Sequence, residues 1–192
     1  MTDPTKKILR DTMKQKRSKL SVSYNTAASI QICSRIRSLE QYKNAKNIAF
    51  YAAANKEIDL ASLWHHASSH EKICYFPVLK EDDLTLFFLP ATPNTLFKKN
   101  RYGIAEPDIS LDLAIPIENL DLVLIPLVAF DVRCNRLGMG AGYYDRTFKN
   151  KGKCSLFGVG YQFQRVDYID LEPWDVQLNA VITQRAIYWH SK

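Results

Sequence analysis

The chain has 192 residues, of which 46% are hydrophobic and 24% charged, and its formal net charge is +6. This length and apolar content suffice for one core without disulfide or metal staples, so we expect residues 1–192 to form a single domain. Four cysteines without a CxxC spacing argue against a zinc site and a secreted disulfide framework, and a cytoplasmic location is the simplest expectation. We expect no membrane partner, because the N-terminus lacks an apolar signal segment and no stretch approaches the roughly 20 apolar residues of a membrane span.

The first predicted element is a basic helix that runs from Asp3 and Pro4 to Leu20. A proline near the first turn is typical of a helix start, and Leu9 and Met13 share one stripe with Leu20. The first twenty residues also include seven cations, namely Lys6, Lys7, Arg10, Lys14, Lys16, Arg17 and Lys19. A solvated helix face is the simpler interpretation of these charges, and an anionic partner is the alternative.

Helices and strands are then predicted in alternation. A helix is expected from Ser23 to Leu39, with Ser23 as its cap, and another is expected to begin after Asp59. The predicted strands are Asn47–Ala54, Lys72–Leu79, Leu84–Leu89, Leu122–Phe130, Ser155–Tyr161 and Ala180–Thr183. Residues Thr92–Pro107 are expected to be irregular. Alternation of this kind favours an α/β fold around a mostly parallel sheet.

The most informative stretch follows the apolar run Leu122–Phe130. Three of the seven glycines, Gly138, Gly140 and Gly142, fall within five residues, and a helix is expected from Gly142 to Asn150. Glycines in such a position allow backbone N–H groups to approach an anion closely, and a helix N-terminus adds a favourable dipole. The loop is therefore a candidate phosphate cradle. Its spacing fits neither a dinucleotide fingerprint nor a P-loop, and a tight turn without a ligand remains the alternative.

Several neighbours of these glycines suit a nucleotide site. Arg136 can hold a phosphate bidentately, Asp145 can coordinate Mg²⁺, and Tyr143 and Tyr144 can pack on a flat heterocycle. Each residue also has an ordinary structural alternative: a surface arginine, an aspartate in the first turn of a helix, and two core tyrosines.

This region resembles a known family. The segment IPLVAFDVRCNRLGMGAGYYDR is similar to the pattern PGxAFDxxGxRLGxGxGYYDR of the 5-formyltetrahydrofolate cyclo-ligases, also called 5,10-methenyltetrahydrofolate synthetases. The resemblance extends over most of the chain in the family's order, through KKILRDTMKQKR, EIDL at Glu57, RYGIAEP and PWDVQLNAVIT. Two positions depart from the pattern, because Leu127 and Cys134 stand where glycine is usual.

The resemblance implies a fold and a reaction. The expected fold is a three-layer α/β/α sandwich around a mostly parallel sheet, similar to that of sugar-phosphate isomerases and CoA transferases. The expected reaction is the ATP- and Mg²⁺-dependent cyclisation of 5-formyltetrahydrofolate to 5,10-methenyltetrahydrofolate, with release of ADP and phosphate. In the family's mechanism ATP phosphorylates the formyl oxygen, and nitrogen 10 of the folate then attacks the activated carbon. Positioning and charge neutralisation would supply most of the catalysis.

The resemblance also implies roles for individual residues. The implied ATP-binding residues are Lys6, Arg10, Arg136, Gly138, Gly140, Ala141, Gly142, Tyr143 and Tyr144. The implied folate-binding residues are Ala52, Glu57, Met139 and Tyr143, and the implied Mg²⁺ ligands are Asp145 and Asp175. The remaining cations of the first helix, from Lys14 to Lys19, are expected to face solvent. We hypothesise that the Glu57 carboxylate pairs with the N–H donors of the pterin edge, whereas Tyr144 either closes over the pocket or packs in the core.

Three alternatives concern other classes of site. His66 and His70 have the i, i+4 spacing of metal ligands but lack an acidic partner, so surface histidines are the simpler interpretation. The basic helix suits a nucleic-acid-binding module, yet no recognition motif accompanies it. An isomerase or CoA transferase on the same scaffold would need no ATP. We therefore expect small-molecule substrates, no nucleic acid, and a monomer.

Overall fold

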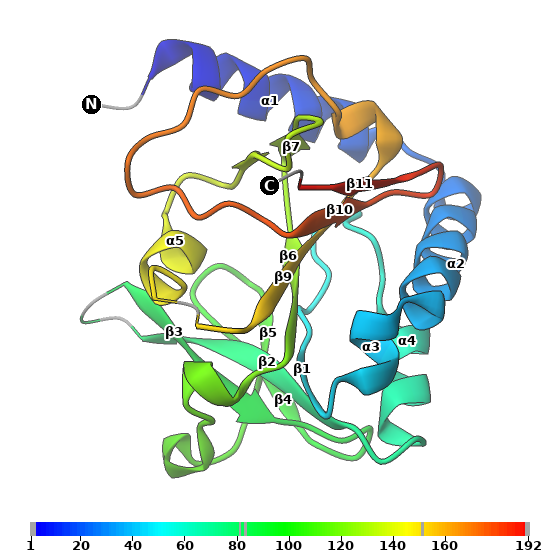
Figure 1. Cartoon of the computed structure of the whole chain (residues 1–192), viewed down its shortest axis with the longest axis vertical. Helices are drawn as coiled ribbons and strands as arrows, with labels where there is room; N and C mark the ends of the chain where they lie inside the picture. The colour runs from blue at the N-terminus through cyan, green and yellow to red at the C-terminus, as the bar shows by residue number, and fades with distance from the viewer. Residues whose placement is uncertain (1–2, 81, 83, 151, 191–192) are drawn as a thin grey trace.

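The computed structural model describes residues 3–80, 82, 84–150 and 152–190. Its main sheet has seven strands in the order β11-β10-β9-β6-β1-β2-β3 (Figure 1). The strands are β1 (Asn47–Ala49), β2 (Ile73–Lys80), β3 (Thr85–Pro90), β6 (Leu122–Pro126), β9 (Ser155–Val159), β10 (Ala180–Ile182) and β11 (Ile187–Trp189). The strands from β10 to β2 pair in parallel, and the two edge strands β3 and β11 pair antiparallel. The predicted α/β class with a mostly parallel sheet is confirmed.

The centre of the sheet is buried on both faces, as the apolar run of β6 predicts. Leu122 and Leu124 point into one core, and Val123 and Ile125 point into a second core on the opposite face. Helices α2 (Val22–Ser38), α3 (Glu40–Asn44) and α4 (Ala61–Ser68) cover the first core (Figure 1). The second core is closed in part by α5 (Tyr143–Thr147) and by the irregular segments beside it. Among the described residues, no helix has the length and apolar character that a membrane span requires.

The N-terminal helix α1 (Pro4–Ser18) crosses one end of the sheet (Figure 1). The Asp3 carboxylate caps it by accepting a 2.8 Å hydrogen bond from the Thr5 N–H. Its apolar side packs through Met13 on a small core that also includes β7 (Ala129–Phe130) and β8 (Arg136–Leu137). This contact places the cations of the helix next to the loop that follows β8, residues 138–142, which we call the glycine loop.

Several predicted boundaries are wrong for local reasons. The run Leu122–Phe130 divides into β6 and β7, and between them the Leu127 and Val128 carbonyls accept hydrogen bonds from the Gln164 side chain. The helix expected to begin at Ser23 begins at Val22, since the Ser21 hydroxyl accepts from the Tyr24 N–H.

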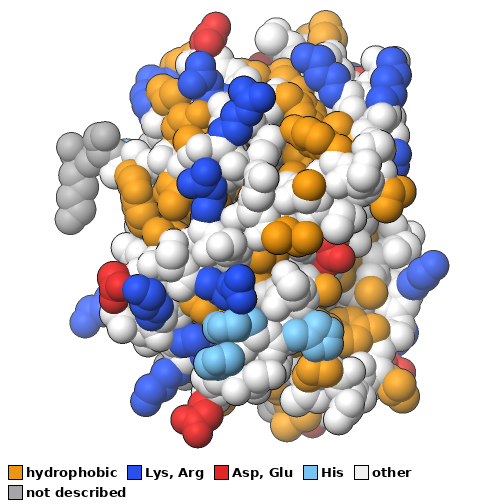
Figure 2. All heavy atoms as spheres, turned by 90° about the vertical axis from the view of Figure 1, so that its right-hand side faces the viewer, with side chains coloured by type: hydrophobic (Ala, Val, Ile, Leu, Met, Phe, Trp, Pro, Cys, Tyr) orange, Lys and Arg blue, Asp and Glu red, His pale blue; other side chains and the backbone are white. Residues whose placement is uncertain are grey.

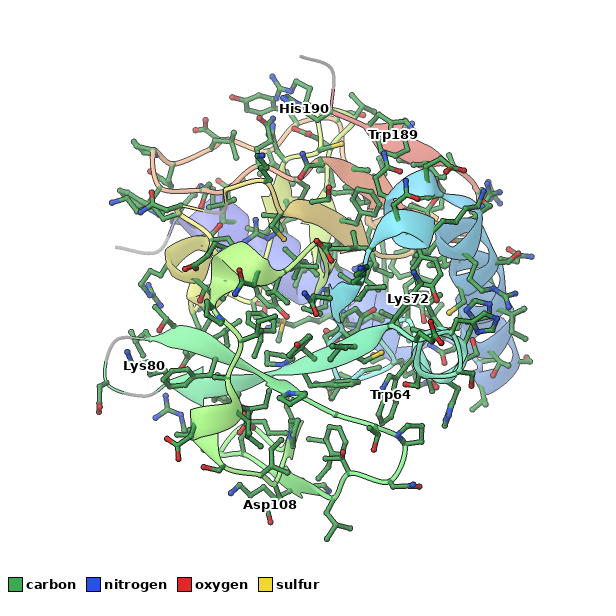
Figure 3. All side chains as sticks on the ribbon, turned by 60° about the horizontal axis from the view of Figure 1, so that its bottom comes forward. Trp64, Lys72, Lys80, Asp108, Trp189 and His190 are labelled. Carbon is green, nitrogen blue, oxygen red and sulfur yellow. The ribbon has the colours of Figure 1, made fainter. Side chains whose placement is uncertain are left out.

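The segment expected to be irregular also contains regular structure. Strands β4 (Phe97–Lys99) and β5 (Ala105–Pro107) pair antiparallel and form a small second sheet. This sheet lies beside the β2–β3 hairpin, because the Leu79 N–H near the end of β2 donates a hydrogen bond to Glu106 in β5. Lys80 at the end of β2 and Asp108 just after β5 are labelled in Figure 3. The short helix α3 and the edge strand β11 were not predicted either.

Candidate functional site

A cavity of about 800 Å³ opens between α1, the glycine loop and the small second sheet. Every residue that the resemblance assigns to ATP, folate or Mg²⁺ lines it: Lys6, Arg10, Ala52, Glu57, Arg136, Gly138, Met139, Gly140, Ala141, Gly142, Tyr143, Tyr144, Asp145 and Asp175. These residues come from segments that lie far apart in the sequence. The fold therefore brings the whole predicted set to one place, and the ligand of each residue stays a prediction.

The glycine loop has the backbone conformation that its composition suggests. Gly140 and Gly142 have positive φ angles of 106° and 70°, which residues with a side chain rarely adopt. Gly138 has an ordinary φ, and a side chain there would meet no atom within 4 Å. The helix after the loop is only five residues long, shorter than the predicted Gly142–Asn150, so most of any anion affinity must come from loop N–H groups and nearby cations.

Two cations of α1 reach this loop. The Arg10 Nε donates a 2.9 Å hydrogen bond to the Gly138 carbonyl, and its guanidinium lies over Gly140. The Lys6 ammonium is 3.4 Å from a carboxylate oxygen of Glu172. Both side chains therefore face the cavity beside the glycines, as phosphate-binding cations would.

A third cation of α1 has a different environment from the one predicted. Arg17 was expected on a solvated face, but its side chain is 4% exposed and its Nη1 lies 3.4 Å from Glu57 Oε1. The expectation is wrong for Arg17 because α1 packs this side against the segment after β1.

Arg136 and Asp145 form a buried ion pair on the cavity wall. The Arg136 Nη2 donates to Asp145 Oδ1 over 2.8 Å, and its Nη1 donates to the Val176 carbonyl over 2.5 Å. The Arg136 side chain is 5% exposed. The Arg136 guanidinium already donates hydrogen bonds to two protein acceptors. Arg136 is therefore better placed to orient Asp145 than to bind a phosphate through two hydrogen bonds. The implied contact with ATP stays a prediction.

The two predicted metal ligands each keep an acceptor free. Asp145 Oδ1 accepts from Arg136 and from the Val176 N–H, and Asp175 Oδ2 accepts from the Glu172 N–H. The opposite oxygen of each carboxylate accepts no hydrogen bond from the described residues. Within that part of the chain, no three His, Cys, Asp or Glu side chains gather as a metal site. Two carboxylates that each keep one oxygen free suit Mg²⁺, which usually takes its other ligands from water and phosphate oxygens.

Glu57 lies in a tight turn between β1 and α4. Its Oε2 accepts a 3.1 Å hydrogen bond from the Ala54 N–H, and Arg17 holds its other oxygen. Burial raises the pKa of the Glu57 carboxyl above its usual value, and the nearby Arg17 charge opposes this rise. The turn includes Asn55 and Lys56, which both have positive φ. Glu57 is thus a fixed part of the cavity wall, and its expected pairing with the pterin stays a prediction.

The two tyrosines of the loop have different surroundings. The Tyr143 hydroxyl accepts a 3.0 Å hydrogen bond from Arg101, which connects the glycine loop to the small second sheet. Tyr144 stacks on Phe148 at the edge of the second core while it also lines the cavity. Burial, with the nearby Glu57 carboxylate, raises the pKa of the Tyr144 hydroxyl far above its usual value, so this group stays protonated. Tyr144 therefore packs at the edge of the core and lines the cavity, and its closure over a bound substrate stays a prediction.

Some cavity residues were not singled out by sequence reasoning. These are Glu106, Asn100 and Tyr102, which come from the RYGIAEP region. The resemblance already marked this segment, so closeness in sequence to the motif was the signal that could have identified them.

The histidine cluster lies elsewhere. The rings of His66 and His70 stack with centroids 4.0 Å apart, and His66 Nδ1 lies 3.0 Å from the Tyr42 hydroxyl. Histidine side chains are visible in pale blue on the face covered by the helices (Figure 2). All four cysteines are buried, and no disulfide joins any two of them.

Comparison with known proteins gives a consistent result. A model of the 5-formyltetrahydrofolate cyclo-ligase family matches residues 2–184. A 5-formyltetrahydrofolate cyclo-ligase of Haemophilus influenzae is 36% identical over 177 residues, which cover 91% of this chain and 95% of that protein. Its counterpart in Escherichia coli K12 is 31% identical over 179 residues, covering 92% and 98%.

Solved structures agree with this result. The NMR structure of 5,10-methenyltetrahydrofolate synthetase from Aquifex aeolicus superimposes with a TM-score of 0.84 at 29% identity, covering 97% of this chain and 93% of that one. A synthetase from Mycoplasma pneumoniae superimposes with a TM-score of 0.75 at 26% identity, covering 93% and 98%. The chain belongs to the 5-formyltetrahydrofolate cyclo-ligase family.

Proposed function

We propose that this protein catalyses the ATP- and Mg²⁺-dependent cyclisation of 5-formyltetrahydrofolate to 5,10-methenyltetrahydrofolate, with release of ADP and phosphate. The observation that carries the proposal is the shared cavity. Two cations of α1, a glycine loop with positive φ angles, and two carboxylates with free oxygens all face one space of about 800 Å³. The names of the similar proteins support the same reaction.

The reaction explains why these groups belong together. A formamide carbonyl is a weak electrophile and its oxygen is a poor leaving group. Transfer of the ATP γ-phosphoryl group to that oxygen makes it a good leaving group. Nitrogen 10 then attacks the formyl carbon and loses its proton to solvent, and the C–O bond breaks with loss of phosphate. The protein must align two substrates and neutralise the phosphate charge.

We assign the phosphates to the side of the cavity formed by α1 and the glycine loop. Lys6 and Arg10 would supply positive charge there, and the N–H groups from Gly138 to Gly142 would donate to phosphate oxygens. Asp145 and Asp175 would hold Mg²⁺, which when bound neutralises the charge on the transferred group. Arg136 would fix the orientation of Asp145.

The folate would occupy the opposite side. Ala52 and Glu57 after β1, Met139 in the loop, and Tyr143 would form its walls. Tyr144, which stays protonated, would present a hydroxyl donor to the same space.

We also propose that residues 1–192 act as one domain, as a monomer in the cytoplasm, without nucleic acid. The contacts of α1 support the last point, because Arg10 and Arg17 make intramolecular contacts and do not form a free cationic face.

Stoichiometry tests the proposal. The purified protein with ATP and Mg²⁺ should release ADP only when 5-formyltetrahydrofolate is added, one ADP for each folate converted. ADP release that is independent of folate, or folate conversion without ATP, would contradict it, and the second outcome would favour an isomerase-like activity.

A further inference from the structure

Glu106 is a buried carboxylate that forms no ion pair within the described residues. It lies in β5, is 6% exposed, and lines the cavity. Lys98 lies opposite it in β4 and acts on it electrostatically, but the Lys98 ammonium pairs with Asp108 at 2.7 Å. Two partly buried carboxylates of the cavity, Glu57 and Asp145, each pair with an arginine.

Among the described residues, only one oxygen of this carboxylate accepts hydrogen bonds. Glu106 Oε1 accepts from the Leu79 N–H over 3.0 Å and from Asn100 Nδ2 over 2.7 Å. Oε2 accepts no hydrogen bond from the described residues. A carboxylate has about four acceptor positions. No buried side-chain oxygen or nitrogen of the described residues lacks a hydrogen-bond partner, so the free Oε2 is an oxygen that stays accessible from the cavity. The structure therefore leaves Glu106 with acceptor capacity on a cavity wall.

The carboxylate is held firmly in this position. Asn100 organises its own turn, because its Oδ1 accepts from the Tyr102 and Ile104 N–H groups while its Nδ2 holds Glu106. β1 pairs with β2 only from Ile73 to Tyr75, so Leu79 has no strand partner on the β1 side of β2. Its N–H donates a hydrogen bond to Glu106 there. The acceptor is thus fixed from two sides before any ligand arrives.

We propose that Glu106 accepts N–H donors from the pterin ring of 5-formyltetrahydrofolate and so selects and orients this substrate. The inference rests on the function proposed above. The pyrimidine part of a reduced pterin carries a 2-amino group and an N3–H on one edge, and both are donors. This edge is remote from the formyl group on nitrogen 5 and from nitrogen 10, so Glu106 acts on binding and alignment and not on the bonds that change.

Glu57 is less suited to this contact. Both of its oxygens already have partners, Arg17 and the Ala54 N–H, and the Arg17 charge reduces its strength as an acceptor. The geometry therefore favours Glu106 as the acceptor of the donor edge, while Glu57 shapes the wall.

The first test is Glu106→Gln. Glutamine keeps the size, and its carbonyl can still accept from Leu79, but its amide group places donors against the donors of the pterin. Binding of 5-formyltetrahydrofolate without ATP, measured by calorimetry, should weaken about tenfold or more, because a charge-assisted hydrogen bond is lost. The KM for ATP and the thermal midpoint should stay near their wild-type values. Glu118→Gln, an exposed position outside the cavity, makes the same charge change and should leave folate binding unchanged.

A second measurement does not depend on how well the variant folds. The wild type should bind 5-formyltetrahydrofolate about tenfold or more tightly than its 2-desamino analogue, and Glu106→Gln should lose most of this discrimination. Equal binding of the two ligands by the wild type would overturn the assignment, as would a variant that discriminates as well as the wild type. If the wild type converts 5-formyltetrahydrofolate yet these outcomes occur, only the inference fails. If it neither binds nor converts this folate, the proposed function fails as well.

Discussion

Arg17 of α1 and Glu57 of the turn after β1 form an ion pair beneath the cavity, with Nη1 and Oε1 3.4 Å apart and side chains only 4% and 14% exposed. The pair joins the N-terminal helix to the wall on which we place the folate. Since both charges are buried, each depends on the other more than a surface pair would.

Arg17→Gln should therefore destabilise the protein by about 3 kcal/mol near neutral pH, because it leaves the Glu57 charge buried without its partner. Urea unfolding measures this change. Lys16→Gln removes an exposed charge from the same helix and should change stability by less than about 0.5 kcal/mol. Equal effects of the two substitutions would contradict the importance of the pair.

The cost of Arg17→Gln should also depend on pH. Burial already raises the pKa of Glu57, so its ionised form is disfavoured in the folded state, and stability falls as pH rises from the usual glutamate pKa through the folded one. Loss of Arg17 raises that folded pKa further. The difference between variant and wild type should therefore be large at about pH 7.5 and smaller at about pH 5, where Glu57 takes up a proton. A constant difference would show that the Glu57 charge is not involved.

Replacement by alanine should destabilise the protein more at Gly140 than at Gly138. Gly140→Ala forces a side chain onto a backbone with φ of 106° and should cost about 1–3 kcal/mol of stability. Gly138→Ala has an ordinary φ and open space, so it should cost less than about 1 kcal/mol, while its methyl group narrows the proposed phosphate site. Thermal unfolding together with the KM for ATP separates the two effects. A stability loss at Gly138 as large as that at Gly140 would count against the backbone argument.

Cys134 is one of the two departures from the family pattern. It stands where glycine is usual, and its φ of 64° is positive. Glycine is ordinarily less stable than alanine at a given position, but here the order should reverse. Cys134→Gly should be more stable than Cys134→Ala by about 1 kcal/mol, because only glycine adopts this φ without strain. Chemical unfolding of the two variants checks the order, and a more stable alanine variant would refute it.

Asp145→Asn should separate positioning from metal binding. It leaves the buried Arg136 guanidinium without its carboxylate and should lower stability by about 1–3 kcal/mol even without metal. On the proposed function, the Mg²⁺ concentration for half-maximal nucleotide binding should also rise about tenfold. Asp112→Asn, at an exposed position outside the cavity, is the control. An unchanged Mg²⁺ dependence would remove Asp145 from the metal site.

Local patterns predicted the sheet better than they predicted its surroundings. Long apolar runs such as that of β6 are decided by burial on both faces, which is visible in the sequence. The ends of the strands within such runs cannot be predicted from the runs themselves. Here Gln164, which is remote in sequence, donates hydrogen bonds to the Leu127 and Val128 carbonyls just after β6. The short strands β4 and β5 were missed for a similar reason, since proline and glycine near them indicate turns more strongly than their few residues indicate strands.

The candidate site was predicted as a set of residues but not as a set of contacts. Motif resemblance named the residues that line the cavity. It did not show that Arg136 forms an ion pair with Asp145, or that Arg17 forms one with Glu57. It also did not show that one oxygen of Glu106 stays free of hydrogen bonds from the described residues. These contacts depend on tertiary packing. The second departure from the family pattern is also explained by packing. Leu127 fills space beside Gly158 and Gly160, where a Cβ would come within 2.9 Å and 2.7 Å of its methyl groups.

The most direct measurement follows the near-ultraviolet absorbance of the methenyl product. With the purified protein, absorbance should increase only when 5-formyltetrahydrofolate, ATP and Mg²⁺ are all present, and omission of any one should stop the increase. No increase with the folded protein and all three components would contradict the proposed cyclisation.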